Sequence, residues 1–171
     1  MRELAVIILE TERLILRNLK EEDAAVMYDY RNHIRCSKYQ RGQTKDLPGI
    51  IRLVQTHQNA CITTDHSFIV AVARKDTNEM IGEIVVMPND GAITLGYTFS
   101  YKYHRQGYAY EALSAFTELL HKCFPEWEFI CFTDVENTAS IALLEKLGYQ
   151  NLGYAEKITS QVFGKWITEG I

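Results

Sequence analysis

Three strand-like segments follow one another closely in this chain, and a long amphipathic helix pattern comes directly after them. The segments SFIVAVAR, MIGEIVVM and AITLGYTFS, within residues 67–100, are separated by the turn signals DTNE and PNDG. This spacing predicts an antiparallel meander. Residues 107–123 then carry apolar side chains at helical spacing, and Pro125 ends the pattern. Because the apolar stripe of such a helix must be buried, we expect the helix to lie on the sheet.

The flanking segments extend the alternation of strands and helices. A strand is predicted at residues 13–18, and helices are predicted in KEEDAAVMYDYRNH and after Pro48. Towards the C-terminus, WEFICFTDV indicates a strand, NTASIALLEKLG a helix ending at Gly148, and residues 149–167 two more strands. We therefore expect a single α+β domain over residues 1–171, with a mixed sheet of about six to seven strands and helices on both faces.

Charge and cysteine content restrict the function classes. The net charge of −4 gives no long-range attraction for nucleic acid or for an anionic membrane. The apolar run at residues 5–9 is interrupted by Glu10 and Glu12, which predicts neither a membrane span nor a secretory signal, and hence a cytoplasmic protein. The four cysteines lack metal-ligand spacing, so we expect buried, reduced thiols and no metal site.

The segment TLGYTFSYKYHRQGYAYEAL, residues 94–113, joins a strand to a helix through a short polar turn. Gly107 removes side-chain bulk, so the N–H groups of residues 105–109 would converge at the positive end of the helix dipole. Such a loop suits a phosphate group, and Lys102 and His104 add donors beside it. A glycine before a helix is also common in ordinary turns, so this spacing is weak evidence on its own.

The motif HRQGYA within this segment resembles the pyrophosphate-binding motif of GNAT acyltransferases. Gly107 and Ala109 match that motif and Gln106 is typical of it, whereas His104 stands where the family has Gln or Arg. The segment ENTASIALLEKLGY, residues 136–149, resembles a second GNAT motif. TERLILR and MIGEI resemble segments of the RimJ/RimL-type branch. The resemblance therefore covers most of the chain, in order.

The resemblance implies binding of acetyl-CoA and transfer of its acetyl group to a primary amine, on a small molecule or a protein N-terminus. It implies a sheet that splays between residues 96–100 and residues 129–134, where the pantetheine arm pairs with strand backbone. The implied cofactor contacts are Thr98, Phe99, His104, Arg105, Gln106, Gly107, Tyr108, Ala109, Asn137 and Ser140.

The catalytic groups depart from the usual family pattern. Leu144 occupies the position of the usual tyrosine acid, so the resemblance leaves Ser140, with Asn137, as candidates for protonating the leaving thiol. Asn137 is equally explained as an ordinary helix N-cap. Thr94 stands where the family often has a glutamate base, which leaves Glu83 as a substitute candidate; Glu83 is also explained as the solvent face of a strand.

Two further questions stay open at the level of sequence. Because the usual tyrosine and glutamate are missing, a non-catalytic module that binds acyl-CoA and acts as a sensor is an alternative to an enzyme. An exposed C-terminal strand at residues 160–167 would allow strand pairing across a homodimer.

Overall fold

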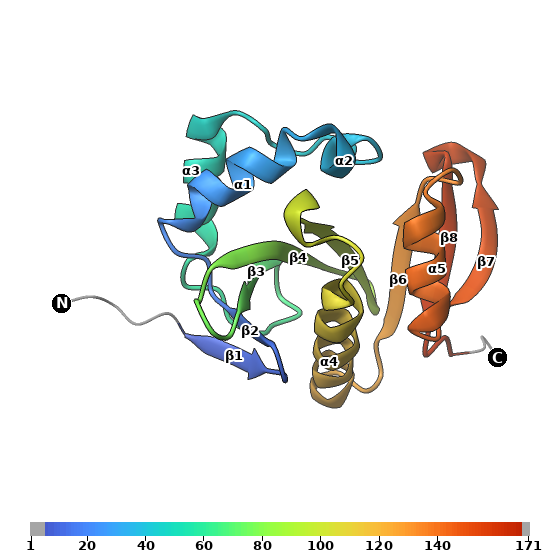
Figure 1. The fold of residues 1–171 in the computed structure, drawn as a ribbon. Helices are drawn as coiled ribbons and strands as arrows, with labels where there is room; N and C mark the ends of the chain where they lie inside the picture. Colours follow the sequence, from blue (N-terminus) through green and yellow to red (C-terminus); the bar gives the residue numbers. More distant parts are fainter. Residues whose placement is uncertain (1–5, 169–171) are drawn as a thin grey trace.

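The structure, a computed structural model, describes residues 6–168 and folds them around an eight-stranded sheet (Figure 1). The strands are β1 (Ile7–Glu10), β2 (Leu14–Arg17), β3 (Phe68–Arg74), β4 (Met80–Asn89), β5 (Ala92–Phe99), β6 (Glu128–Thr133), β7 (Gln150–Ala155) and β8 (Ser160–Lys165). Their order across the sheet is β1-β2-β3-β4-β5-β6-β8-β7. The pair β5–β6 is parallel and the other neighbouring pairs are antiparallel.

Helices cover both faces of the sheet, as predicted. One face carries α1 (Asp23–Arg31), α2 (Ile34–Ser37) and α3 (Leu47–His57), and the other carries α4 (Tyr108–Cys123) and α5 (Thr138–Lys146). Short 3₁₀ turns lie at η1 (Tyr101–Tyr103) and η2 (Glu156–Ile158). Two buried cores result: Met27 and Ile50 pack with Ala71 on the first face, whereas Phe116 packs with Val72 on the second. Ala71 and Val72 are neighbours on β3 and belong to different cores, because successive side chains of a strand point to opposite faces.

The sheet differs from the prediction at both ends. Strand β1 was not predicted, because its sequence IILE shows no alternation of apolar and polar residues. Strand β8 lies between β6 and β7, so the expectation of an exposed strand at residues 160–167 that could pair across a dimer is wrong. The edge strands are β1 and β7, since the hairpin after β7 folds β8 back against β6.

The sheet opens between its two parallel strands. β5 and β6 are paired only from Ala92↔Glu128 to Thr94↔Ile130, near the start of both strands. Beyond these pairs, residues 95–99 and 131–133 continue as strands without being paired to each other. Figure 1 shows β6, β8 and β7 standing apart from β5 at this end. The expected splay is therefore present, and we call the space between the two strand ends the gap.

The cysteines follow the prediction only in part. Cys36 and Cys131 are buried, whereas Cys61 and Cys123 are exposed. All four are free thiols. Over residues 6–168, no helix is both long and apolar enough to cross a membrane.

Candidate active site

The loop between β5 and α4 presents a row of free backbone donors. Arg105 and Gly107 both have left-handed backbone conformations, with φ of 61° and 80°. Gly107 is the N-cap of α4, and the residues of the loop from 104 to 107 are exposed. Across the part of the chain that the structure describes, the N–H groups of residues 104–110 have no hydrogen-bond acceptor. Unpaired N–H groups at the positive end of a helix are suited to binding an anion.

Arg13 contacts this loop through its side chain. It was not among the predicted site residues. Its Nη1 donates to the carbonyl oxygen of Gln106 at 2.9 Å, and its guanidinium lies 4.2 Å from the ring centre of Tyr108. Its Nε donates to Glu111 of α4 at 2.7 Å. The only sequence signal was its position in the TERLILR segment. Arg13 therefore ties the start of β2 to the first turn of α4.

The side chains of the loop do not all face the free donors. His104, at the atypical position of the motif, places Nε2 2.7 Å from the carbonyl oxygen of Phe99 and so closes the loop on the strand end. The Nε2 of Gln106 donates to the carbonyl of Lys102 at 3.4 Å. Arg105 is exposed, and Tyr108 and Ala109 begin α4. The backbone of the predicted segment, more than its side chains, therefore presents the free donors.

Side chains from neighbouring segments occupy the gap side of β5. The carbonyl oxygen of Tyr97 accepts from Nε2 of Gln40 at 3.3 Å, and that of Phe99 accepts from His104 and from the thiol of Cys36 at 3.2 Å. These carbonyls would bond to β6 in a continuous sheet. They are therefore available to any extended ligand that displaces the side chains.

Thr98 and Phe99, both predicted as cofactor contacts, are buried by the protein itself. The Oγ1 of Thr98 accepts from Nε2 of Gln43 at 3.1 Å. The Phe99 ring packs in the core beside Gly82, where an added Cβ would lie 2.7 Å from the ring. Their backbone, and not their side chains, lies beside the gap.

Asn137 and Ser140 lie at the start of α5, across the gap from β5. Asn137 is the N-cap, because its Oδ1 accepts from the N–H of Ser140 at 3.2 Å. The Oγ of Ser140 lies 2.6 Å from the hydroxyl of Tyr97 on β5. Leu144, at the position of the usual acid, is buried in the core. Ser140 lies one helical turn before Leu144 on α5, and its hydroxyl is paired with that of Tyr97.

Glu83 is part of a buried ion pair and not of a solvent-exposed face. Its side chain is fully buried, and its two carboxylate oxygens accept from Nε and Nη2 of Arg31 at 2.8 and 2.6 Å. The hydroxyl of Tyr30 also donates to it at 3.1 Å. The expectation that Glu83 faces solvent is wrong, because α1 covers this face of β4. A carboxylate enclosed in this way has no path to an incoming amine, so we interpret it as structural.

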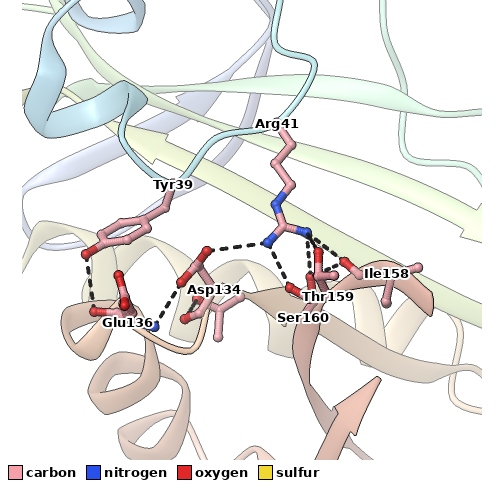
Figure 2. Close-up of polar contacts among 8 residues, drawn as sticks. Tyr39, Arg41, Asp134, Glu136, Ile158, Thr159 and Ser160 are labelled. Carbon is pink, nitrogen blue, oxygen red and sulfur yellow. Dashed lines mark hydrogen bonds and ion pairs between the residues drawn. The ribbon is translucent and has the colours of Figure 1, made fainter. Parts of the chain in front are cut away.

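A connecting segment at residues 38–45, which we call the strap, reaches across to the far side of the gap (Figure 2). The guanidinium of Arg41 donates to the carbonyl oxygens of Ile158 and Thr159 at 2.6 and 2.8 Å and approaches Asp134 at 3.4 Å. Thr159 is a β-branched residue in a left-handed conformation, with φ of 47°. Such a conformation is unfavourable and needs support from its surroundings.

The strap is held by side chains more than by its backbone. Tyr39 donates to the carbonyl oxygen of Glu136 at 3.2 Å, which adds a second contact with the far side (Figure 2). On the near side of the gap, the side chains of Gln40 and Gln43 donate hydrogen bonds to Tyr97 and Thr98 of β5. The side chains on residues 39–43 therefore link β5 to the β6–α5 and β7–β8 connections, and these contacts cover one side of the gap.

A sheet that opens between two parallel strands, beside a helix start with unpaired amides, defines an α+β protein of the class that binds an extended anionic ligand at the opening of its sheet. The sequence profile of the acetyltransferase (GNAT) domain matches residues 13–150. The chain therefore belongs to the GNAT family of acetyltransferases.

Relatives agree with this assignment. The uncharacterized N-acetyltransferase YoaA of Bacillus subtilis (strain 168) is 26% identical over 150 residues, which cover 85% of this chain and 84% of YoaA. The crystal structure of a GNAT-family acetyltransferase from Bacillus anthracis superposes with a TM-score of 0.78 at 22% identity, covering 91% and 95% of the two chains. RimL, a ribosomal L7/L12 alpha-N-protein acetyltransferase solved with coenzyme A, superposes with a TM-score of 0.75 at 16% identity, covering 94% and 97%.

Proposed function

We propose that this acetyltransferase binds acetyl-CoA at the β5–α4 loop and in the gap, and transfers the acetyl group to a primary amine. The observation that carries the proposal is the row of unpaired N–H groups at residues 104–110, in the part of the chain that the structure describes. A diphosphate is a ligand of matching charge for such a row. The RimL structure with coenzyme A shows that a protein of this fold accommodates the carrier.

We propose that the carrier is bound as an extended ligand that continues from the diphosphate into the gap. The carbonyls of Tyr97 and Phe99 line that path and already accept hydrogen bonds from movable side chains, Gln40 and His104. A pantetheine amide can replace these donors, as an added strand would. The bound thioester supplies an activated acetyl group and a sulfur leaving group. We assign Asn137 and Ser140, at the start of α5, to the neighbourhood of the sulfur, as the resemblance implies.

The residues of this chain supply few groups for proton transfer. The nucleophile must be a neutral amine, and an α-amino group with a pKa of about 8 is partly neutral near pH 7.5. Because Glu83 is enclosed by Arg31, we propose that water carries the amine proton away. Ser140 is the side chain that we assign to the leaving sulfur, with its backbone fixed by Asn137.

We propose that the acceptor amine reaches the site from the side that the strap covers. The strap bonds to both sides of the gap, so its displacement would uncover the strand ends. RimL is named for acetylation of a ribosomal protein N-terminus, and the TERLILR and MIGEI segments support the same branch for this chain. A protein N-terminus or a small-molecule amine is therefore the acceptor class that we propose.

The test is an acceptor screen that measures release of free thiol from acetyl-CoA. The panel contains N-terminal peptides, polyamines and small primary amines, and isothermal titration with CoA is run in parallel. We expect CoA to bind and at least one amine to release thiol above the hydrolysis background. Tight CoA binding without transfer to any amine would instead indicate a non-catalytic acyl-CoA sensor. No CoA binding would refute the assignment of the loop.

Asn137→Asp separates the two roles of that residue. Aspartate caps a helix as well as asparagine, so the melting temperature is expected to stay within a degree or two of the wild-type value. A negative charge beside an anionic carrier should weaken CoA binding. Unchanged CoA affinity would show that Asn137 is only a helix cap.

A further inference from the structure

We propose that Tyr97 is a positioning residue that holds the Ser140 hydroxyl so that its hydrogen points to the leaving sulfur. This inference rests on the proposed function, which places the sulfur near Ser140. The two hydroxyl oxygens lie 2.6 Å apart, although one belongs to β5 and the other to α5. The contact therefore spans the gap at the place where acetyl transfer is proposed.

Both partners are fixed by other contacts. Ser140 sits in the first turn of α5, where the Asn137 cap holds its backbone N–H at 3.2 Å. Tyr97 lies on the core face of β5, where its ring packs against the buried cluster under α4. A side chain held by its strand at one end and by its hydroxyl at the other has little rotational freedom. The position of the Ser140 hydroxyl is thus determined from two directions.

The direction of the hydrogen bond decides what Ser140 can do. A serine hydroxyl has one hydrogen and two lone pairs. If Tyr97 donates to Ser140, the serine hydrogen stays available for the sulfur; if Ser140 donates to Tyr97, it is not. A phenol is the stronger donor of the two. Burial raises the pKa of Tyr97, so the phenol keeps its proton through the neutral range and remains a donor.

The pair acts on the sulfur by hydrogen bonding and not by giving up a proton. A thiol has a pKa of about 8.5 and a tyrosine about 10, so transfer of the tyrosine proton to a thiolate is unfavourable even before burial is considered. When the carbon–sulfur bond breaks, its electron pair goes to sulfur and the Ser140 O–H hydrogen-bonds to the resulting charge. Water then supplies the proton that converts the thiolate to a thiol.

The direct test is a titration of the thiol of bound CoA, followed by the ultraviolet absorbance of the thiolate. The variants are Tyr97→Phe, Ser140→Ala and the double variant. We expect the pKa of the bound thiol to be lowest in the wild type and to rise in Tyr97→Phe. Ser140→Ala should raise it at least as much, and the double variant should match Ser140→Ala. The titration is read as the difference between CoA-bound and CoA-free protein, which removes the signal of the exposed thiols of Cys61 and Cys123. The buried thiol of Cys131 does not interfere, because burial raises its pKa to about 12.

Tyr149→Phe is the matched control. Tyr149 is buried in the same core, and its hydroxyl has no hydrogen-bond partner among the described residues. Its removal should leave the bound-thiol pKa at the wild-type value. If Tyr97→Phe also leaves that pKa unchanged, or if its effect persists in full in the Ser140→Ala background, Tyr97 does not act through Ser140 and the inference is overturned.

Kinetics separate this inference from the proposed function. With any amine found in the screen, we expect Tyr97→Phe to lower kcat about tenfold, which is the size of effect that the loss of one hydrogen bond in the transition state produces, with KM for acetyl-CoA unchanged. A purely structural role would instead lower the melting temperature and leave kcat per folded molecule unchanged, which would also overturn the inference. If no amine accepts acetyl, the proposed function fails, and the thiol titration still decides the role of Tyr97.

Discussion

Replacement of Gly107 by alanine tests the loop on which cofactor binding depends. Gly107 has φ of 80°, and the left-handed region costs a residue with a Cβ about 1–2 kcal/mol. Alanine also restricts the unfolded chain, which offsets about 0.4–1 kcal/mol of this strain. The added Cβ would lie 3.4 Å from Nη2 of Arg13, an ordinary contact with a flexible side chain. We therefore expect a net loss of about 1 kcal/mol, or about 2–4 °C in Tm for a chain of this size.

The effect on CoA binding should be larger than the effect on stability. If the loop relaxes to relieve the strain, one or more N–H groups turn away from the diphosphate. A hydrogen bond to a charged group contributes about 1.5–3 kcal/mol, so the Kd for CoA should rise by about tenfold or more. Thermal denaturation measures the first effect, and isothermal titration with CoA measures the second.

Gly91→Ala is the matched control for this prediction. Gly91 has φ of 81° in the turn between β4 and β5, and an added Cβ there meets no atom within 4 Å. The backbone strain is therefore the same, while the β5–α4 loop is untouched. We expect the same loss of stability with the wild-type Kd for CoA. If both variants bind CoA as the wild type does, the amides around Gly107 do not hold the diphosphate.

Three further predictions follow from buried or bridging side chains. Glu83→Gln leaves the charge of buried Arg31 uncompensated and should lower the free energy of unfolding, measured in urea, by about 3–5 kcal/mol. We expect kcat per folded molecule to be retained, and a reduced kcat at full stability would make Glu83 the general base. Arg41→Ala should accelerate proteolytic cleavage of the strap and change KM for the acceptor, with Kd for CoA unchanged; equal cleavage rates would show that Arg41 does not hold the strap. Burial lowers the pKa of His57, so its neutral form favours the fold and the stabilisation is lost as pH falls below about 6.5. The decrease in Tm between pH 7.5 and 5.5 should be smaller in His57→Gln, and an identical decrease would exclude His57 as its source.

The strands and helices could be predicted where the sequence has a clear period. The meander of β3, β4 and β5 and the helices α4 and α5 follow from alternation, turn residues and apolar stripes, all of which are local signals. Strand β1 lacks such a signal, because it forms by pairing with β2 and its own side chains show no buried face. The place of β8 in the sheet could not be predicted either, since strand order depends on pairing between distant segments.

In the site, too, local features could be predicted from the sequence and contacts between distant residues could not. The backbone conformation around Gly107 was predictable, because a glycine between a strand and a helix is a local signal. The contacts of Arg13 with Gln106, and of Tyr97 with Ser140, join residues 93 and 43 positions apart and have no local signature. Glu83 was interpreted as solvent-exposed because a single charge in an apolar strand usually points outward, and its partner on α1 is 52 positions away.

The position of the strap links acceptor entry to the rest of the gap. Gln40 bonds to the carbonyl of Tyr97, the residue whose hydroxyl holds Ser140. An extended ligand that takes this carbonyl must displace Gln40 and loosen one end of the strap, while Arg41 still holds the other. Carrier binding would therefore weaken the strap before the acceptor arrives, which gives a physical reason for an ordered sequence in which acetyl-CoA binds first. In Gln40→Ala the acceptor should no longer need acetyl-CoA to bind first. Initial rates measured with both substrates varied test this, and an ordered pattern unchanged from the wild type would contradict it.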